Sequence, residues 1–187
     1  MKNFPVTFID QDDNQKKTGW VSRSVSVSGF IFCYDFFLCQ WLVLANKRGK
    51  KTSEFSGYWN CPCGYLKYNE TASEAMSRKI LEETGLEIYP EQLSLCAINS
   101  SPEENHQNVV IRYFTILDQD YTNYLLLTDE YGELNKTEEI EWIPVNKIDQ
   151  YQWAFNHDVI ISEIFNSYVD IPWWKKIIRK LYSKYCA

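Results

Sequence analysis

The sequence predicts an α+β fold in one domain, and three observations support this prediction. Short runs rich in β-branched and aromatic residues are more frequent than helical segments, as is typical of a sheet. Two long helices are indicated before the C-terminal tail, without a strict βαβ rhythm. The 187 residues, 45% of them hydrophobic and 24% charged, suffice for one domain with a sizeable core.

The composition divides the chain into three parts. Residues 1–20 are polar and acidic to mixed, which predicts a loose arm or an edge segment. Residues 21–170 carry the strand and helix patterns and form the predicted domain. Residues 171–187 place an apolar stripe beside a cationic face, which predicts a basic amphipathic helix. Such a helix can dock on its own domain, pair two copies as a homodimer, or lie on an anionic membrane surface; we favour docking or dimerisation.

Five segments define the predicted strands and a loop among them. The apolar runs at 30–32 and 41–44 predict a hairpin or two adjacent strands. The basic segment 46–56 that follows predicts an exposed loop. Residues 109–116 predict a further strand, and residues 139–144, where acids alternate with apolar residues, predict a half-exposed one.

The helices are marked by their ends. Thr71 and Glu74 have the spacing of a capping box, and Gly85 stands where a helix commonly ends in a left-handed residue, so a helix is predicted over 71–84. A second helix is predicted over about 156–168 from its apolar spacing.

Charge and hydropathy exclude several classes of protein. A net charge of −6 and a pI near 5.0 argue against a protein that coats extended nucleic acid through a broad basic surface. The most apolar stretch, residues 29–45, is interrupted by Asp35 and Gln40, so no membrane span is expected. The N-terminus lacks a secretory signal pattern, and the expected location is cytoplasmic.

The cysteines and histidines give weak signals. Six scattered cysteines predict reduced thiols rather than a disulfide framework. Cys61 and Cys63 could begin a zinc site, but no second ligand pair follows, and burial is the better interpretation. His157 stands at the start of the second helix, where we expect a capping or surface role rather than catalysis.

The first helix ends in two adjacent glutamates, Glu82 and Glu83. Carboxylates at this end oppose the helix dipole and repel each other, so a positive charge must compensate them. A divalent cation is one candidate, since Mg²⁺ and Mn²⁺ prefer oxygen ligands. Pairing with Arg78 and Lys79, one turn earlier, is the alternative, and the helix alone favours it.

The residues before this helix add a longer pattern. Gly64 is followed after five residues by Glu70 and after seven more by Arg78-Lys79-Ile80-Leu81-Glu82-Glu83-Thr84-Gly85-Leu86. This segment resembles the Nudix box, GX5EX7REUXEEXGU with U apolar, in every fixed position except Lys79. The resemblance extends more weakly over about residues 21–168. It implies an α/β/α sandwich with a mixed sheet, and metal-dependent hydrolysis of nucleoside diphosphates linked to another moiety, with Mg²⁺ or Mn²⁺ as cofactor.

The resemblance also implies roles for single residues. Glu82 and Glu83 would be catalytic metal ligands, and the Gly64 carbonyl would be a further metal ligand. Glu70 and Arg78 would form a structural pair that holds the loop against the helix.

Lys79 departs from the family pattern, which has a glutamate at this position. A lysine here can pair with both following glutamates, which lowers metal affinity, and it is a poor general base. Either another carboxylate supplies the base, with Glu139 as the first candidate beside Glu138, Glu130 and Glu133, or catalysis is weakened or lost. Arg48 in the basic segment is a candidate substrate-binding residue for a small nucleotide derivative. The alternative function is a noncatalytic nucleotide-binding or regulatory module.

Overall fold

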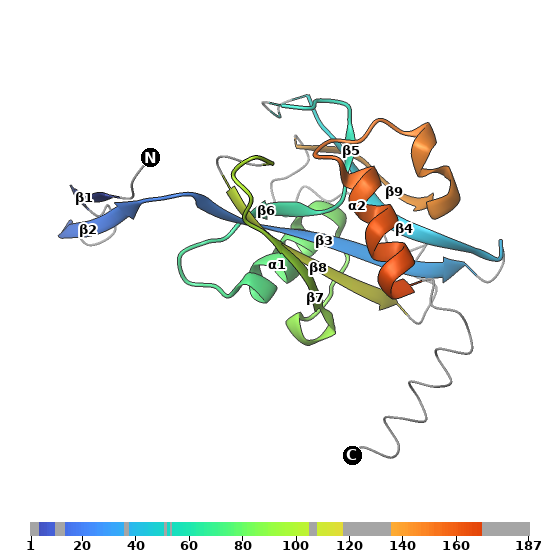
Figure 1. Ribbon diagram of the computed structural model, residues 1–187, viewed down its shortest axis with the longest axis horizontal. Helices are drawn as coiled ribbons and strands as arrows, with labels where there is room; N and C mark the ends of the chain where they lie inside the picture. The colour runs from blue at the N-terminus through green and yellow to red at the C-terminus, as the bar shows by residue number, and fades with distance from the viewer. Residues whose placement is uncertain are drawn as a thin grey trace, which may run out of the picture.

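The computed structural model describes residues 4–9, 14–35, 38–50, 52, 54–104, 108–117 and 136–169 (Figure 1). Its strands are β1 (Phe4–Ile9), β2 (Lys16–Val21), β3 (Ser24–Asp35), β4 (Gln40–Arg48), β5 (Trp59–Asn60), β6 (Cys63–Tyr65), β7 (Ser94–Asn99), β8 (Asn108–Leu117) and β9 (Thr137–Pro144). Its helices are α1 (Ala72–Thr84) and α2 (His157–Ile164), with short helical turns η1 (Pro90–Gln92), η3 (Val145–Gln150) and η4 (Phe165–Val169).

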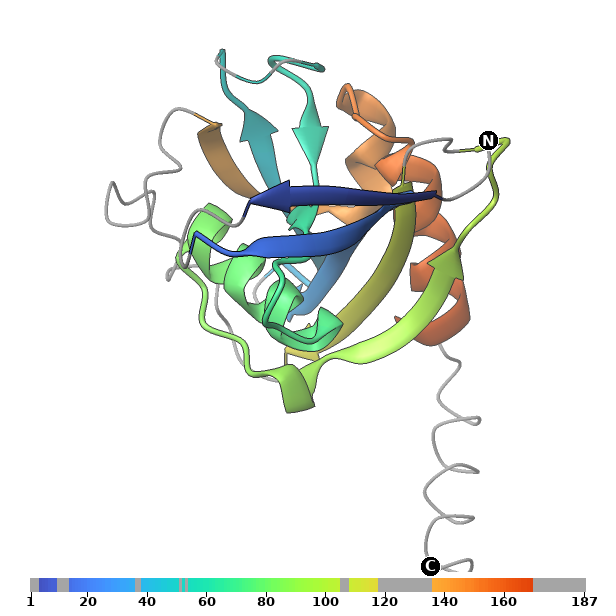
Figure 2. The ribbon, with the colours of Figure 1, turned by 90° about the vertical axis from the view of Figure 1, so that its left-hand side faces the viewer.

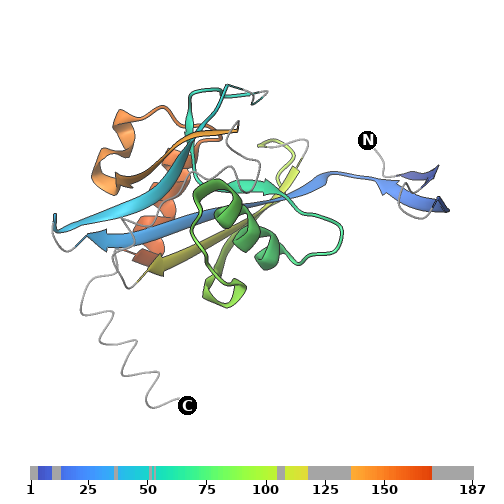
Figure 3. The same cartoon turned by 180° about the vertical axis from the view of Figure 1, so that it is seen from behind.

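Seven strands form one mixed sheet in the order β5-β4-β3-β8-β7, with β6 added to β3 and β9 to β4. β3 and β8 run parallel, whereas the other pairs are antiparallel. Figure 2 shows α1 and α2 on opposite faces of this sheet, and Figure 3 shows β9 lying along β4. This arrangement confirms the predicted α+β sandwich with a mixed sheet.

Each face of the sheet has its own core, because successive strand residues point to opposite faces. Val27 and Ile31 of β3 are buried on one face, against Met76 of α1. Phe30 and Phe32 are buried on the other face, in a cluster that includes residues of α2. The two helices are therefore held against the sheet by separate apolar clusters, and both can position side chains around one end of it.

One side of β3 pairs with two different strands along its length. Residues 32–35 pair with β4, whereas residues 26–28 pair with β6. The far end of β4 pairs instead with β5 and β9. The sheet therefore divides between β3 and β4, and the loop from β5 to β6 joins the two halves directly before α1.

Several elements differ from the sequence predictions. The expected loose arm is an antiparallel hairpin, β1 with β2, which forms a separate two-stranded sheet and projects from the domain (Figure 1). The first residues of the predicted loop 46–56 belong to β4, because that strand gains partners in β5 and β9. β5 and β6 are too short to give a clear sequence pattern, and β7 is a strand that the sequence analysis did not predict.

Other predictions concern the ends of the chain and its thiols. The predicted basic helix over 171–187 lies outside the described residues. No helix in the described part of the chain is long and apolar enough to span a membrane. Within the described residues, no disulfide joins Cys33, Cys39, Cys61, Cys63 and Cys96.

Candidate functional site

Helix α1 begins and ends as its sequence predicts. Thr71 is the N-cap, and its hydroxyl accepts a hydrogen bond from the backbone of Glu74, whose carboxylate binds the Thr71 backbone in return. Gly85 closes the helix with φ 71°, in the left-handed region that glycine adopts without strain. The capping box and the C-cap fix which residues face the sheet and which face the loop from β6.

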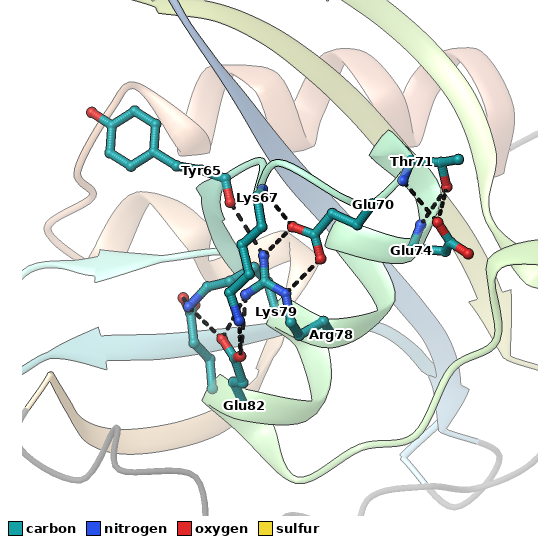
Figure 4. A network of polar contacts seen from close by, with 9 residues as sticks. Tyr65, Lys67, Glu70, Thr71, Glu74, Arg78, Lys79 and Glu82 are labelled. Atoms are coloured by element: carbon teal, nitrogen blue, oxygen red, sulfur yellow. Dashed lines mark hydrogen bonds and ion pairs between the residues drawn. The ribbon is translucent and has the colours of Figure 1, made fainter. Parts of the chain in front are cut away.

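An ion pair ties this loop to the helix (Figure 4). Arg78 donates to Glu70 through Nε at 2.9 Å and through a terminal nitrogen at 2.6 Å, and it also donates to the Tyr65 carbonyl at 3.2 Å. The hydrogen bonds from Arg78 hold the pKa of Glu70 below its usual range. The structure therefore brings together the two residues for which a structural pairing was expected.

Lys79 lies between the two glutamates at the end of α1. Its ammonium is 3.0 Å from Glu82 Oε2 and 3.1 Å from Glu83 Oε1, and its side chain is only 10% exposed. Burial raises the pKa of Glu82, but hydrogen bonds and charges from Lys79 and Arg78 outweigh burial, so the net shift is downward. Glu82 is consequently ionised, and both carboxylates already lie beside a cation of the same helix.

Gly64 provides the space that Lys79 needs. A β-carbon at this position would lie 2.6 Å from Cε and 2.8 Å from Cδ of Lys79. The aliphatic stem of Lys79 thus crosses directly over the backbone of β6 to reach Glu82 and Glu83. A side chain at position 64 would displace the lysine and separate these charges.

The donor atoms suit a divalent cation, but their arrangement does not fit one as it stands. Two carboxylates and the Gly64 carbonyl are the hard oxygen ligands that Mg²⁺ prefers. The Lys79 ammonium lies within hydrogen-bonding distance of both Glu82 and Glu83, so an ion would have to displace it. In the described ranges, no group of three or more His, Cys, Asp or Glu residues is arranged to hold a metal.

The charges around the box balance without an ion. Glu82 is approached by Arg78 at 3.0 Å and by the Lys67 ammonium at 3.8 Å, in addition to Lys79. Among the described residues, three cations therefore face three carboxylates, since Glu70 pairs with Arg78 and Glu83 with Lys79. A divalent cation is attracted to a site with excess negative charge, and this cluster has none.

A cleft of about 1400 Å³ opens beside the box. Its walls come from β3, β4, β5, β8, the box, and the start of α2. Three polar residues deep in this cleft are almost completely buried and carry an atom without a hydrogen-bond partner. These are Ser28 (Oγ), Asn46 (Oδ1) and Asn60 (Oδ1), which are 3%, 3% and 1% exposed. Since buried polar groups in native proteins are normally paired, these atoms indicate a ligand-binding wall.

His157 is a buried anchor, so the expected capping or surface role was wrong. It is 4% exposed, and its Nδ1 accepts a hydrogen bond from the Cys61 backbone at 2.9 Å. Burial, followed by the nearby charges of Arg112 and Arg48, lowers its pKa to about 3. The ring is therefore neutral and fixes the loop before the box to the start of α2, a contact that its neighbours in sequence do not reveal.

Cys63 lies beside the carboxylates but does not act as a thiolate. Burial and the charge of Glu83 raise the pKa of its thiol to about 12. Burial also raises the pKa of Cys61 well above its usual value. Thiols bind zinc and attack substrates as thiolates, so neutral and buried thiols agree with the interpretation that these cysteines are packed rather than reactive.

Arg48 and Glu139, the other predicted site residues, lie in different places. Arg48 ends β4 and lines the cleft, where its Nε donates to the Glu54 carbonyl at 3.1 Å. Glu139 lies on β9, is 53% exposed, and pairs with Lys47 at 3.4 Å. It is not among the residues that line the cleft. The structure thus brings Arg48 to the box residues and leaves Glu139 apart from them.

Two aromatic rings form the rim of the cleft beside Arg48. Phe55 and Phe155 are 42% and 41% exposed, and their ring centroids are 5.0 Å apart. The Arg48 guanidinium lies over the Phe155 ring, 5.0 Å from its centroid. Both phenylalanines have a positive φ, 54° and 60°, which is unusual for a bulky residue and is most often found at functional sites.

Sequence reasoning missed Arg112, Ser28, Asn46 and Asn60. Arg112 is the one charged residue within β8, a strand that is otherwise uncharged and mostly apolar. A lone cation in a strand of this kind is a signal that could have found it. The other three are small polar residues that the sequence does not distinguish from ordinary strand positions.

Comparison with known proteins agrees with this fold and box. The model of the NUDIX domain matches residues 31–164. An ADP-ribose pyrophosphatase of Methanocaldococcus jannaschii is 32% identical over 162 residues, which cover 87% of this chain and 85% of that protein.

Two solved structures show the same fold at lower identity. A MutT/nudix family protein from Enterococcus faecalis has a TM-score of 0.66 and 22% identity, covering 83% of this chain and 66% of that one. The NUDIX domain of Shewanella oneidensis NrtR, complexed with ADP ribose, has a TM-score of 0.61 and 20% identity, covering 78% and 88%. At these identities the likeness establishes the fold alone.

Proposed function

Because the chain belongs to the Nudix family of pyrophosphohydrolases, we propose that it hydrolyses the pyrophosphate bond of a nucleoside diphosphate linked to another moiety. ADP-ribose is the first substrate to test, since it is named for the relative that is 32% identical over most of both chains. The observation that carries the proposal is the box itself, whose two glutamates end α1 on the wall of a cleft of about 1400 Å³.

The cleft has the features that a nucleotide derivative requires. Its volume exceeds the usual size of a site for a small ligand, so a molecule with two linked moieties can enter it. Phe55 and Phe155 offer aromatic faces at its rim, where a nucleobase can stack. Arg48 lies over the Phe155 ring and lines the cleft, where it can meet a phosphate group.

Hydrolysis of a pyrophosphate bond needs a water molecule directed at phosphorus and compensation of the charge on the phosphate oxygens. A bound Mg²⁺ or Mn²⁺ supplies both in enzymes of this family, and either ion remains our prediction for this chain. The residues present do not fit an ion while Lys79 pairs with Glu82 and Glu83, so we assign no step to one. What these residues supply is a wall of carboxylates held in fixed positions, with their charge neutralised by Lys79 and Arg78.

The same ion pairs favour a second candidate, a noncatalytic module that binds a nucleotide derivative. In that case Lys79 keeps the box folded and neutral, and the cleft binds a ligand without cleaving it. The two candidates share the cleft and differ in turnover alone.

The test is AMP release from ADP-ribose, and from a panel of dinucleotides and sugar nucleotides, measured in Mg²⁺, in Mn²⁺ and in EDTA. The enzyme proposal expects release from at least one substrate. Glu83→Gln should lose this activity, whereas Glu91→Gln, an equivalent change at an exposed glutamate of η1, should not. Saturable binding of ADP-ribose without release under any condition would instead establish the module.

A further inference from the structure

Two groups among the cations that line the cleft differ in their partners. Lys67, Arg78 and Lys79 belong to the box, and each forms an ion pair with Glu82. Arg48 and Arg112 come from the strands, and neither forms an ion pair with a residue that the structure describes. The positive charge that is left for an anionic ligand is therefore on the strands rather than at the box.

Arg112 lies beside a second group that lacks a partner. The parallel register of β3 and β8 places it next to Ser28, so the two side chains share one face of the sheet. The hydroxyl of Ser28 and the Nε of Arg112 are buried, and neither has a hydrogen-bond partner in the part of the chain that the structure describes. Both residues line the cleft. Two adjacent buried donors without partners destabilise the free protein, which indicates that a ligand with acceptor atoms completes them.

Arg48 approaches the same part of the cleft from β4. Both guanidinium groups are close enough to His157 that their charges, after the larger effect of burial, lower the pKa of its imidazole. His157 itself stays neutral, and its Nδ1 is already bound to Cys61. Glu163 lines the same cleft, but it forms no ion pair with Arg112 within the described residues. Among the described residues, no carboxylate forms an ion pair with Arg112 or Arg48, so their charge can face an anionic ligand.

We propose that Arg112 and Ser28, together with Arg48, form an anion subsite that binds a phosphate group of the ligand directly, without a bridging metal ion. A guanidinium suits this role, because its planar N–H groups match two phosphate oxygens and its charge does not titrate. The proposal deepens the proposed function and rests on it, since it assigns the phosphate contacts of the same cleft. It also agrees with the balanced charges of the box, because arginines on the strands, rather than a metal ion, compensate the negative charge of the ligand.

The experiment is calorimetric titration in EDTA with two probes, inorganic pyrophosphate and ADP-ribose. The wild-type protein should bind both. Arg112→Gln should weaken the binding of both by about 10-fold or more, the usual effect of losing a hydrogen bond to a charged group. Ser28→Ala should weaken binding by about 3- to 10-fold, as expected for a neutral hydrogen bond.

Control variants distinguish a loss of affinity at this site from a general effect of net charge or of impaired folding. Lys147→Gln removes one positive charge from an exposed turn outside the cleft and should leave both affinities unchanged. Ser28→Ala should keep or raise the melting temperature, because it removes a buried hydroxyl without a partner. A purely structural role of Ser28 would lower the melting temperature instead. Arg112→Lys keeps the charge and loses the planar fork, so its affinity should lie between wild type and Arg112→Gln.

The two probes distinguish this inference from the proposed function. Binding of pyrophosphate that depends on Arg112, without binding of ADP-ribose, supports the subsite and contradicts ADP-ribose as the ligand. Binding that appears only after Mg²⁺ is added, or that is equal in wild type and Arg112→Gln, overturns the subsite whether or not ADP-ribose is cleaved. A lack of pyrophosphate binding by the wild type also overturns it.

Discussion

The two sides of the cleft differ in how their charges and hydrogen bonds are matched. On the box side, Lys79 and Arg78 pair with the carboxylates of the same segment, so the polar atoms have partners within the chain. On the strand side, Ser28 and Arg112 keep buried donors without partners. The motif that identifies the family is therefore not the part of the site whose buried polar groups lack partners among the described residues. The predictions below test whether the box can be opened to an ion and whether the strand side depends on a ligand.

The largest effect is expected from Lys79→Glu, which breaks the balance on the box side. The change removes the ammonium between Glu82 and Glu83 and adds a third carboxylate, so excess negative charge can attract a divalent ion. Binding of Mn²⁺, measured by calorimetry, should become tighter. Hydrolysis should rise by about 10²- to 10⁴-fold if the added carboxylate also acts as a base.

The matched control for this variant is Lys67→Glu. It makes the same change in charge near Glu82, but at an exposed side chain 3.8 Å away. Equal gains in Mn²⁺ binding by both variants would show that net charge matters rather than the position of Lys79. A fall in both metal binding and turnover in Lys79→Glu would assign a direct catalytic or phosphate-binding role to the lysine.

The next largest effect concerns Glu83→Gln, which keeps the shape of the side chain and removes its charge. Whether this carboxylate positions water or an ion, its charge is required, so hydrolysis should fall by about 10²-fold or more. The free energy of unfolding should change little, because Glu82 still pairs with Lys79. Initial rates with ADP-ribose and urea denaturation measure the two quantities. Unchanged turnover would remove Glu83 from the site.

A pair of stability measurements tests the comparison directly. Lys79→Met leaves two mostly buried carboxylates without their shared cation, and we expect a loss of about 3 kcal/mol in the free energy of unfolding. Arg112→Met removes a guanidinium whose Nε has no partner, so it should be neutral or stabilising. Urea denaturation of both variants decides the matter. Equal losses would mean that the two sides of the cleft do not differ as described.

The sequence predicts the box side of the site well, because its contacts are local. Spacing of three and four residues on a helix brings Lys79 to both Glu82 and Glu83, and the cap residues fix where that helix begins and ends. The strand side could not be predicted in this way. Ser28 and Arg112 are distant in sequence and meet only through the register of two parallel strands, which no local pattern specifies.

The position of His157 shows the same limit. Its neighbours Asn156 and Asp158 indicate a polar helix start, but the backbone of Asn156 is left-handed there and places the imidazole inside the protein. The ring is buried because the Cys61 backbone supplies a donor to it. This partner belongs to the loop before the box, so the burial of His157 follows from the tertiary fold and not from its own segment.

His157 links the two sides of the cleft, and the last prediction tests that link through pH. Its pKa is about 3 in the folded protein, lowered first by burial and then by Arg112 and Arg48, whereas the ordinary value is 6.5. Between these two pH values the unfolded chain binds a proton at His157 that the folded protein does not bind. The contribution of His157 to the free energy of unfolding is therefore fully present above pH 6.5 and is lost as the pH falls toward 3. His157→Asn can still offer an acceptor and cannot titrate, so its free energy of unfolding should depend less on pH across this range than that of the wild type.

The variant itself should be somewhat less stable at pH 8, because the smaller side chain loses the edge contact with Phe30. Urea denaturation at several pH values measures both effects. Parallel pH profiles for the two proteins would show that other groups govern the acid sensitivity and that His157 does not act as the neutral anchor between α2 and the box.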